Sequence, residues 1–89
     1  MNKKAYVYIL LCSDNTLYTG YTFDLEKRIA MHNSKKGSKY TRSRIPVTLV
    51  FHHECNDKND AMKLEYKIKK LKRKDKLKLI ENIIKVESL

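Results

Sequence analysis

The stretch "YVYILLCSDNTLYTGYT", residues 6–22, contains two apolar runs separated by the polar triplet Ser13-Asp14-Asn15. The near-continuous apolar character of residues 4–12 predicts a strand that is buried on both faces. Residues 17–21 predict a second strand, and the polar triplet predicts the turn of a hairpin. Four tyrosines lie in this stretch, although valine or isoleucine would pack there without a hydroxyl that needs a partner.

The length of the hairpin turn decides where these tyrosines point. We predict a three-residue loop with Asn15 in the left-handed conformation that this loop type tolerates. Leu10 then pairs with Tyr18 and Tyr8 with Gly20, so that the two tyrosines share one face of the sheet as diagonal neighbours. A four-residue loop would place them on opposite faces, because a shift of one residue reverses every side chain of a strand.

The rest of the chain predicts one more strand and three helices. Asp24 can cap a helix that runs to about residue 35, and the β-branched and aromatic residues 47–54 predict the third strand. Asp57 can cap a second helix, and Asp75 can begin a third. The apolar positions of that last helix are Leu77, Ile80, Ile83 and Ile84. The order is ββαβαα, an α+β domain with a small three-stranded antiparallel sheet flanked by three helices.

Length and composition indicate one globular domain. We assign residues 1–85 to the domain and residues 86–89 to a C-terminal tail, and 42% of all residues are apolar. No apolar run approaches the roughly 18 residues of a membrane span. The apolar stretch near the N-terminus is followed at once by polar residues without a cleavage site, so we expect a cytoplasmic protein without a signal peptide.

The two cysteines indicate neither a disulfide framework nor a metal site. Cys12 and Cys55 lie far apart, and neither belongs to a C-x-x-C pair. His52 and His53 could join them at a zinc ion, but no ligand spacing supports such a site. We expect two reduced thiols that are mostly buried.

Positive charge is strong and unevenly distributed. Twenty lysines and arginines against ten acidic residues give a net charge of +10, and residues 27–53 contain no acidic residue. A second cluster, residues 63–78, holds nine basic residues beside Glu65 and Asp75. Such a field attracts polyanions, and nucleic acid is the commonest one in a cell. A solvated surface that promotes solubility is the alternative, and it accounts less well for the acid-free window.

Three side chains outside the hairpin could take part in catalysis or binding. Arg28 and His32 lie one helical turn apart and project from the same side of their helix. His32 lies within the apolar stripe of Leu25 and Ile29 and Arg28 at its margin, so both are expected to face the sheet. Glu65 stands at the border of an apolar helix face among lysines. Each also has an ordinary structural explanation: His32 as a hydrogen-bonded core residue, Arg28 as a partner of Asp24, and Glu65 as a partner of Lys69, with such helix pairs contributing about 0.2–0.5 kcal/mol.

The residues together resemble the GIY-YIG nuclease superfamily. Tyr6-Val7-Tyr8 and, ten residues on, Tyr18-Thr19-Gly20 resemble its paired signature. Arg28 and His32 match the helix motif R-x-x-x-H-N, and Glu65 lies in A-M-K-L-E-Y-K-I-K-K, the form of the metal-binding helix. The resemblance covers nearly the whole chain and matches the small stand-alone bacterial members.

Some positions depart from the family pattern. The first triplet begins with tyrosine instead of glycine, and the second has threonine in the middle. Tyr21 replaces a lysine found in some repair members. Many members have an asparagine on the last helix, but Asn82 lies at a loose spacing from Glu65, and we assign it no role.

The resemblance implies a metal-dependent endonuclease that hydrolyses DNA phosphodiester bonds and selects DNA structures met in repair or recombination. The implied catalytic residues are Tyr8, Tyr18, Arg28, His32 and Glu65. Tyr8 would act as general base with Tyr18 beside it, and positive charge should lower its phenolic pKa from about 10. Arg28 would contact phosphate, His32 would accept the tyrosine proton, and Glu65 would hold a single Mg²⁺ or Mn²⁺ per monomer. That ion would stabilise the leaving 3′ oxygen, which predicts 5′-phosphate and 3′-hydroxyl products.

The segment Lys36 to Arg44, after the first helix, is polar, basic and flexible in character. Basic residues here are expected to contact the DNA backbone. The candidate nucleic-acid contacts are Lys35, Lys36, Lys39, Tyr40, Arg42 and Arg44. Such contacts position a substrate and carry little sequence information. We expect DNA as the partner, no membrane, and a transient dimer on the substrate when both strands are cut. The alternative function is a non-catalytic nucleic-acid-binding module on the same fold.

Overall fold

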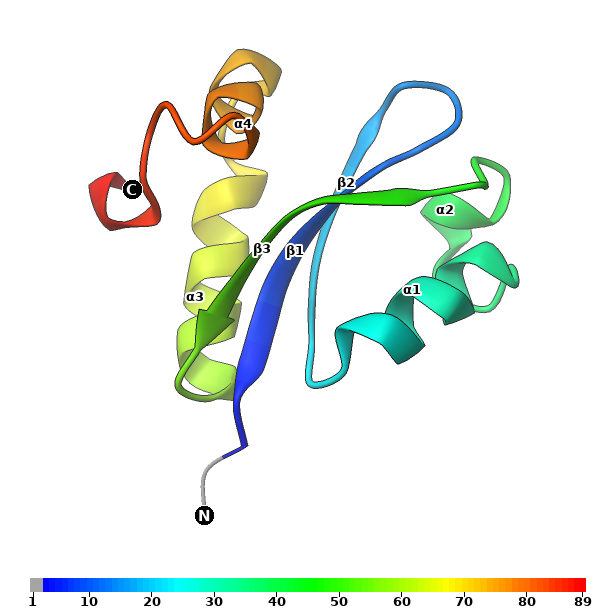
Figure 1. The fold of residues 1–89 in the computed structure, drawn as a ribbon, viewed down its shortest axis with the longest axis horizontal. Helices are drawn as coiled ribbons and strands as arrows, with labels where there is room; N and C mark the ends of the chain where they lie inside the picture. Colours follow the sequence, from blue (N-terminus) through cyan, green and yellow to red (C-terminus); the bar gives the residue numbers. More distant parts are fainter. Residues whose placement is uncertain (1–2) are drawn as a thin grey trace.

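The computed structural model describes residues 3–89, which form an α+β domain around a three-stranded antiparallel sheet (Figure 1). The strands are β1 (Ala5–Leu11), β2 (Leu17–Thr22) and β3 (Thr48–Cys55), in the order β2-β1-β3. The predicted fold class is confirmed. β1 lies in the centre of the sheet, which explains why its residues are apolar on both faces.

Helices cover both faces of the sheet. α1 (Leu25–Asn33) and the short α2 (Lys39–Arg42) lie on one side, and α3 (Lys58–Lys69) and α4 (Arg73–Ile80) lie on the other, as Figure 1 shows. A 3₁₀ turn, Val86–Ser88, follows α4. The predicted caps of the first two long helices are confirmed: Asp24 accepts a hydrogen bond from Lys27 N–H, and Asp57 accepts one from Asp60 N–H.

The hairpin between β1 and β2 has the predicted register. Tyr8 pairs with Gly20, Leu10 pairs with Tyr18, and Asn15 takes a left-handed conformation with φ 68°. The loop has three residues, as predicted, and the Asp14 carboxylate accepts hydrogen bonds from the backbone N–H and the hydroxyl of Thr16. The turn therefore stabilises its own conformation through side-chain contacts.

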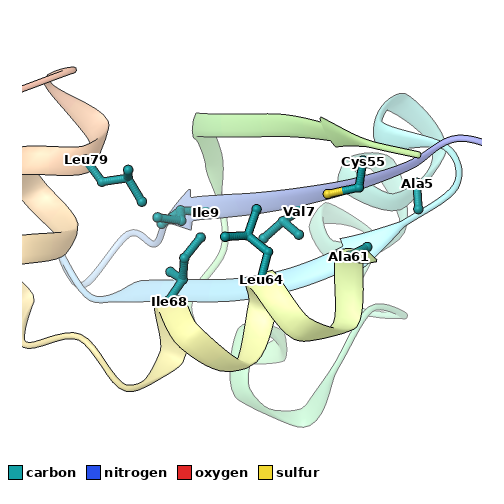
Figure 2. Close-up of a cluster of buried hydrophobic side chains, with 8 residues drawn as sticks. All are labelled: Ala5, Val7, Ile9, Cys55, Ala61, Leu64, Ile68 and Leu79. Atoms are coloured by element: carbon teal, nitrogen blue, oxygen red, sulfur yellow. The ribbon is translucent and has the colours of Figure 1, made fainter. Parts of the chain in front are cut away.

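The larger of the two apolar clusters lies between the sheet and α3. Val7 and Ile9 of β1 project onto Ala61, Leu64 and Ile68 of α3 (Figure 2). The three α3 residues follow the helical spacing of an apolar stripe. Leu79 closes the cluster from α4, and Ala5 and Cys55 complete it.

The second apolar cluster lies on the opposite face of the sheet, under α1. Tyr8 and Leu10 of β1, Cys12 just after it, and Val47 form its buried part. Leu25 and Ile29 of α1 pack against it. Alternation along β1 thus divides its side chains between the two clusters, odd-numbered residues on the α3 side and even-numbered ones on the α1 side. Cys12 and Cys55 are both buried, as expected.

The sequence predicted three helices and a flexible basic segment over residues 36–44, whereas the structure has a fourth helix there. Ser38 caps α2 by accepting a hydrogen bond from Thr41 N–H, and Thr41 is completely buried. A helix of four residues has no periodic pattern that sequence reasoning can detect. Its position depends on the contact that Thr41 makes with α1, described below.

The last helix also differs from its prediction. Lys72 is its N-cap residue, Asp75 lies within its first turn, and the helix ends at Ile80. Asn82 takes a left-handed conformation, φ 64°, which ends the helical path. Leu79 is consequently the buried residue of this helix, whereas the predicted apolar position Ile83 lies beyond it and is 63% exposed.

The C-terminal residues contact the domain. Val86 and Leu89 are partly buried against the cluster under α3. The domain boundary placed at residue 85 remains a prediction. Within the described range 3–89, no helix is both long enough and apolar enough to traverse a bilayer.

Candidate active site

Two strands bring the phenols of Tyr8 and Tyr18 together on the α1 side of the sheet. Their ring centroids lie 6.4 Å apart, as expected for diagonal neighbours on a hairpin. Tyr8 is only 1% exposed, and Tyr18 is partly exposed beside it. The predicted pairing of the two tyrosines is confirmed as a matter of geometry.

Gly20 creates the space that the Tyr8 side chain occupies. The two residues are paired across the hairpin, and the phenol of Tyr8 crosses β2 directly over Gly20. A Cβ atom at Gly20 would stand 2.6 Å from the Tyr8 hydroxyl oxygen and 2.8 Å from the ring carbon that carries it. Glycine is therefore needed here so that the Tyr8 ring can approach the backbone closely. It is not needed for an unusual backbone conformation, because its φ is not positive.

His32 lies behind the two phenols. It comes from the last turn of α1, is fully buried, and packs edge-on against Tyr8 and Tyr18 with centroid separations of 6.0 and 5.2 Å. Its Nε2 atom is hydrogen-bonded to the Tyr8 hydroxyl at 3.0 Å. The expectation that His32 faces the sheet is confirmed.

The other imidazole nitrogen of His32 contacts α2. Nδ1 lies 2.7 Å from the hydroxyl of Thr41, which is also fully buried. Gly37 lies flat against the same ring, so closely that a Cβ atom there would overlap Nδ1 and Cγ. Both ring nitrogens of His32 are thus hydrogen-bonded, and the ring is enclosed by residues of α1, α2 and the hairpin.

Burial raises the pKa of the Tyr8 phenol well above its ordinary value. The negative charge that Tyr18 and Glu65 can carry raises it further, whereas the guanidinium of Arg28 lowers it. Sequence reasoning expected positive charge to lower this pKa, and in the protein alone burial outweighs Arg28. Tyr8 is therefore a neutral phenol at neutral pH, and it can become a base only if its own proton has an acceptor.

Burial also lowers the pKa of His32, and the nearby Arg28 guanidinium lowers it further. An ordinary histidine has a pKa of about 6.5, so a lowered value leaves the imidazole neutral at pH 7. A neutral imidazole has one N–H donor and one nitrogen lone pair. The lone pair makes His32 a proton acceptor within reach of the Tyr8 hydroxyl.

Arg28 and Glu65 come from helices on opposite faces of the sheet. Arg28 is a half-buried residue of α1, and among residues 3–89 it forms no ion pair, so the proposed partnership with Asp24 is absent. Glu65 comes from α3, and its side chain is 19% exposed. Both charges influence the Tyr8 pKa. The phenols and the imidazole are in direct contact. Arg28 acts on the Tyr8 hydroxyl through its charge and, more weakly, through a hydrogen bond, whereas Glu65 acts through its charge alone.

Glu65 is the one candidate metal ligand, and its chemistry suits a hard divalent ion. Within the described part of the chain no group of three histidine, cysteine, aspartate or glutamate residues could hold a metal. A lone carboxylate does not make a structural zinc site, but Mg²⁺ commonly uses one or two carboxylates together with water and substrate oxygens. The Lys69 ammonium group lies 3.6 Å from the Glu65 carboxylate, so a bound ion would replace this ion pair.

The predicted nucleic-acid contacts separate into two groups. The first group has exposed side chains with no ion pair to any residue of the described range, and it consists of Lys35, Lys36, Lys39 and Arg42. Tyr40 and Arg44 form the second group, because their side chains are held by the protein. Tyr40 stacks on Tyr18 with centroids 5.8 Å apart, and the Arg44 guanidinium lies 4.0 Å from the Tyr40 ring centroid.

Arg44 connects α2 to the hairpin loop. Its Nε donates to the Asp14 carboxylate at 2.9 Å, and its Nη1 donates to the Tyr40 carbonyl at 2.7 Å. The backbone carbonyl of Arg44 accepts a further bond from Ser13 N–H. The Arg44 side chain therefore supports Tyr40, and through it Tyr18.

An open cleft of about 530 Å³ lies next to the site. Three cations, Lys3, Lys27 and Arg28, line it against one carboxylate, that of Asp24, and of the five predicted catalytic residues only Arg28 belongs to the lining. The positive lining agrees with an anionic occupant. Arg28 thus stands between the buried phenol of Tyr8 and a solvent-open basic cleft.

Sequence reasoning missed two residues that enclose His32 and follow it in the sequence. Thr41 and Gly37 lie in the segment predicted to be flexible, and their contacts with His32 span nine and five positions of the chain. The available signal was Ser38, three residues before Thr41, which is a good N-cap residue. The third residue of this helix is Thr41 itself, where a capping box would have glutamate or glutamine, so the signal was incomplete.

Comparison with known proteins gives consistent results. The model of the GIY-YIG catalytic domain matches residues 4–78. A UPF0213 protein of Staphylococcus haemolyticus is 55% identical over 78 residues, which cover 88% of this chain and 95% of the relative. The UPF0213 protein YsiG of Lactococcus lactis is 59% identical over 78 residues, 86% of this chain and 75% of the relative.

Two solution NMR structures have similar folds. A UPF0213 protein from Bacillus halodurans is 47% identical, with a TM-score of 0.58 over 88% of this chain and 83% of the other. A protein from E. faecalis is 38% identical, with a TM-score of 0.63 over 92% of this chain and 88% of the other. Both structures are similar in fold and in sequence across most of their length.

Proposed function

Because this chain belongs to the GIY-YIG family, we propose that it is a divalent-metal-dependent endonuclease that hydrolyses DNA phosphodiester bonds. Branched or otherwise structured DNA, of the kind met in repair and recombination, is the proposed substrate. The observation that best supports this function is the buried hydrogen bond between the Tyr8 hydroxyl and His32 Nε2. It gives the Tyr8 phenol a neutral proton acceptor, while Arg28, which acts on the same hydroxyl, lines the basic cleft.

The proposed reaction uses this hydrogen bond as a proton path. Tyr8 accepts a proton from the attacking water while its own hydroxyl proton passes to His32 Nε2, 3.0 Å away. The water oxygen forms a bond to phosphorus, the bond from phosphorus to the 3′ oxygen breaks, and that oxygen takes a proton from solvent. His32 then returns its proton to solvent. Tyr18, in contact with both rings, orients the water.

The two charged residues have complementary roles. Arg28 is half-buried and lines the basic cleft, so its planar guanidinium can bind non-bridging phosphate oxygens in a bidentate manner. Glu65 would hold one Mg²⁺ or Mn²⁺, which when bound supplies charge stabilisation for the departing 3′ oxygen. The products would have 5′-phosphate and 3′-hydroxyl ends.

Exposed cations next to the site would position the DNA. Lys35, Lys36, Lys39 and Arg42 follow the end of α1, on the same side of the sheet as the two phenols. Contacts from such side chains bind phosphates and do not read bases. Any selectivity should therefore concern the shape of the DNA or its single-stranded parts.

Incubation of the purified chain with branched, flapped, single-stranded and duplex DNA, in Mg²⁺ or Mn²⁺, tests the proposal. The wild type should cut at least one substrate, and chelation of the metal should stop cutting until metal is added again. Glu65→Ala should lower the rate by about 100-fold or more and leave binding intact, because it removes the metal ligand. Glu81→Ala changes an exposed acidic residue at the end of α4 and is the matched control.

A non-catalytic DNA-binding module is the second candidate, and the ion pair between Glu65 and Lys69 favours it. In that case Glu65 serves α3 as a helical partner and holds no metal. The same experiment separates the candidates. Binding without cutting, across all four DNA structures and both metals, would reject the endonuclease and support the module.

A further inference from the structure

A chain of buried polar side chains continues behind Tyr8 and reaches the N-terminus of α2. It runs from the Tyr8 hydroxyl through both nitrogens of His32 to the Thr41 hydroxyl, with separations of 3.0 and 2.7 Å. The Thr41 hydroxyl then lies 3.1 Å from Ser38 Oγ and 3.4 Å from the Ser38 carbonyl oxygen. Tyr8, His32 and Thr41 are all 1% exposed or less.

The direction of these hydrogen bonds follows from a count of donors. A neutral His32 has one N–H, and Tyr8 and Thr41 have one O–H each. If Nδ1 carries the proton, it donates to Thr41, the Thr41 hydroxyl donates to Ser38, and the Tyr8 hydroxyl donates to Nε2. Each of the three donors, on Tyr8, His32 and Thr41, then has an acceptor.

The opposite tautomer of His32 leaves a donor without a partner. If Nε2 carries the proton, it donates to the Tyr8 oxygen, and the Tyr8 hydroxyl proton loses its acceptor. Within residues 3–89 His32 Nε2 is the one acceptor hydrogen-bonded to the Tyr8 hydroxyl, because the Arg28 guanidinium, which also acts on this hydroxyl, is only a donor. An unpaired buried donor is costly, so the structure favours the proton on Nδ1.

We propose that Thr41 is a positioning residue, whose hydroxyl accepts the Nδ1–H of His32 and thereby presents the Nε2 lone pair to Tyr8. Gly37 supports this arrangement, because its missing side chain lets the loop close over the imidazole. Thr41 does not line the basic cleft, and His32 is the only one of the five predicted catalytic residues to which it is hydrogen-bonded within residues 3–89, so it acts through His32.

The consequence for catalysis rests on the proposed function. A proton moves from Tyr8 to His32 only if Nε2 has a free lone pair at that moment. Once the imidazole has accepted the proton, its Nδ1–H keeps the same acceptor on Thr41. The ring does not need to turn at any point of the reaction, which is the advantage of a fixed tautomer.

The tautomer can be measured in the whole protein by ¹⁵N NMR of the imidazole nitrogens. Changing the other two histidines, His52→Gln and His53→Gln on β3, leaves His32 as the only imidazole. We expect Nδ1 to have the shift of a protonated nitrogen and Nε2 that of an unprotonated one. A dominant Nε2–H tautomer in this otherwise wild-type protein would overturn the proposal, and this measurement requires no change at Thr41.

Variants at Thr41 test whether its hydroxyl selects the tautomer. Thr41→Val keeps the shape of the side chain and removes the acceptor, so the Nε2–H form should become substantially populated. Thr41→Ser should restore the wild-type spectrum, and Thr48→Val, an exposed threonine on β3, should not alter it. A Thr41→Val protein with native amide shifts and an unchanged His32 tautomer would also overturn the proposal.

A DNA-cutting assay distinguishes this proposal from the endonuclease itself. Thr41→Val should cut about tenfold more slowly or worse, since general-base catalysis contributes far more than that factor, and Thr41→Ser should recover most of the rate. If the wild type has the Nδ1–H tautomer but never cuts DNA, the proposed function fails and the positioning role of Thr41 stands. If the wild type cuts DNA but His32 has the Nε2–H tautomer, the proposed function stands and the positioning role of Thr41 fails.

Discussion

Gly20 shows how a single residue determines the position of a reactive group. Tyr8 is paired with it across the hairpin, and the phenol reaches His32 only because no side chain stands in its path. The family signature places a glycine at this point, and the reason here is close approach between a ring and a backbone, without any positive φ. Gly37 has the same relation to the imidazole of His32.

Gly20→Ala should destabilise the protein by about 1–3 kcal/mol, because the added methyl group overlaps the Tyr8 phenol and forces it to move. Urea unfolding measures this loss. In a Tyr8→Ala background the same substitution should cost much less, since the obstructing ring is gone. Equal losses in both backgrounds would show that the two residues are not coupled, contrary to the structure.

At the scale of the elements, the hairpin loop and α2 support each other. Arg44, just after α2, binds Asp14 of the loop, and the loop's Ser13 N–H donates to the Arg44 carbonyl. Two segments 30 positions apart are held beside Tyr18 in this way. The segment that sequence reasoning considered flexible is therefore tied to both α1 and the β1–β2 hairpin.

Asp14 should make the stability of this junction pH-dependent. Hydrogen bonds from the Thr16 hydroxyl and backbone, and the charge of Arg44, hold the pKa of Asp14 below its ordinary value. A carboxyl whose pKa is lower in the folded state stabilises the protein above its unfolded pKa, about 3.9, and this contribution is lost as pH falls through the folded value. Asp14→Asn should therefore be less stable than the wild type at pH 6, with the difference shrinking below about pH 4.

Unfolding by urea across this pH range measures the effect. Thr16→Val should reduce the pH dependence more than Arg44→Gln does, because the Thr16 hydroxyl makes the largest contribution to the lowered pKa. A constant difference between the wild type and Asp14→Asn from pH 6 to pH 3 would contradict the assignment.

For the whole molecule, the sheet separates two packing regions with different tasks. The side facing α3 is mostly apolar, and the one buried side-chain atom without a hydrogen-bond partner in residues 3–89, the Thr19 hydroxyl opposite Ile9, lies there. The α1 side places polar and ionisable groups inside the fold, including His32 and Thr41. The exposed cations that follow α1 lie on this second side and would bind a polyanion near the two phenols, whereas the basic cluster of residues 63–78 lies on and between α3 and α4 on the other side.

The salt dependence of DNA binding should distinguish free cations from engaged ones. Arg42→Gln should lower the magnitude of the slope of log K against log salt by about 0.9, the value for one released counterion. Arg44→Gln should change it less, because the Asp14 carboxylate already neutralises this guanidinium. Lys74→Gln on α4, on the opposite side of the sheet, is the control and should leave the slope nearly unchanged.

Equal effects of Arg42→Gln and Arg44→Gln would mean that Arg44 leaves Asp14 when DNA binds. The role of Arg44 as a fixed support of Tyr40 would then be wrong. If neither Arg42→Gln nor Arg44→Gln changes the slope, α2 and the residues just after it do not belong to the DNA interface.

The sequence by itself determined the hairpin, its register and the caps of two helices. These features depend on neighbouring residues: loop length and alternation place Tyr8 and Tyr18 on one face, and Asp24 and Asp57 begin their helices with their own side chains. The side of α1 that carries His32 followed from helical periodicity for the same reason.

Only the tertiary structure decided the surroundings of the buried groups. The fourth helix, the contact of Thr41 with His32 and the bond between Arg44 and Asp14 join segments that no local pattern connects. The raised pKa of Tyr8 has the same origin, since desolvation depends on everything packed around the phenol and outweighs the single guanidinium that sequence spacing had placed near it.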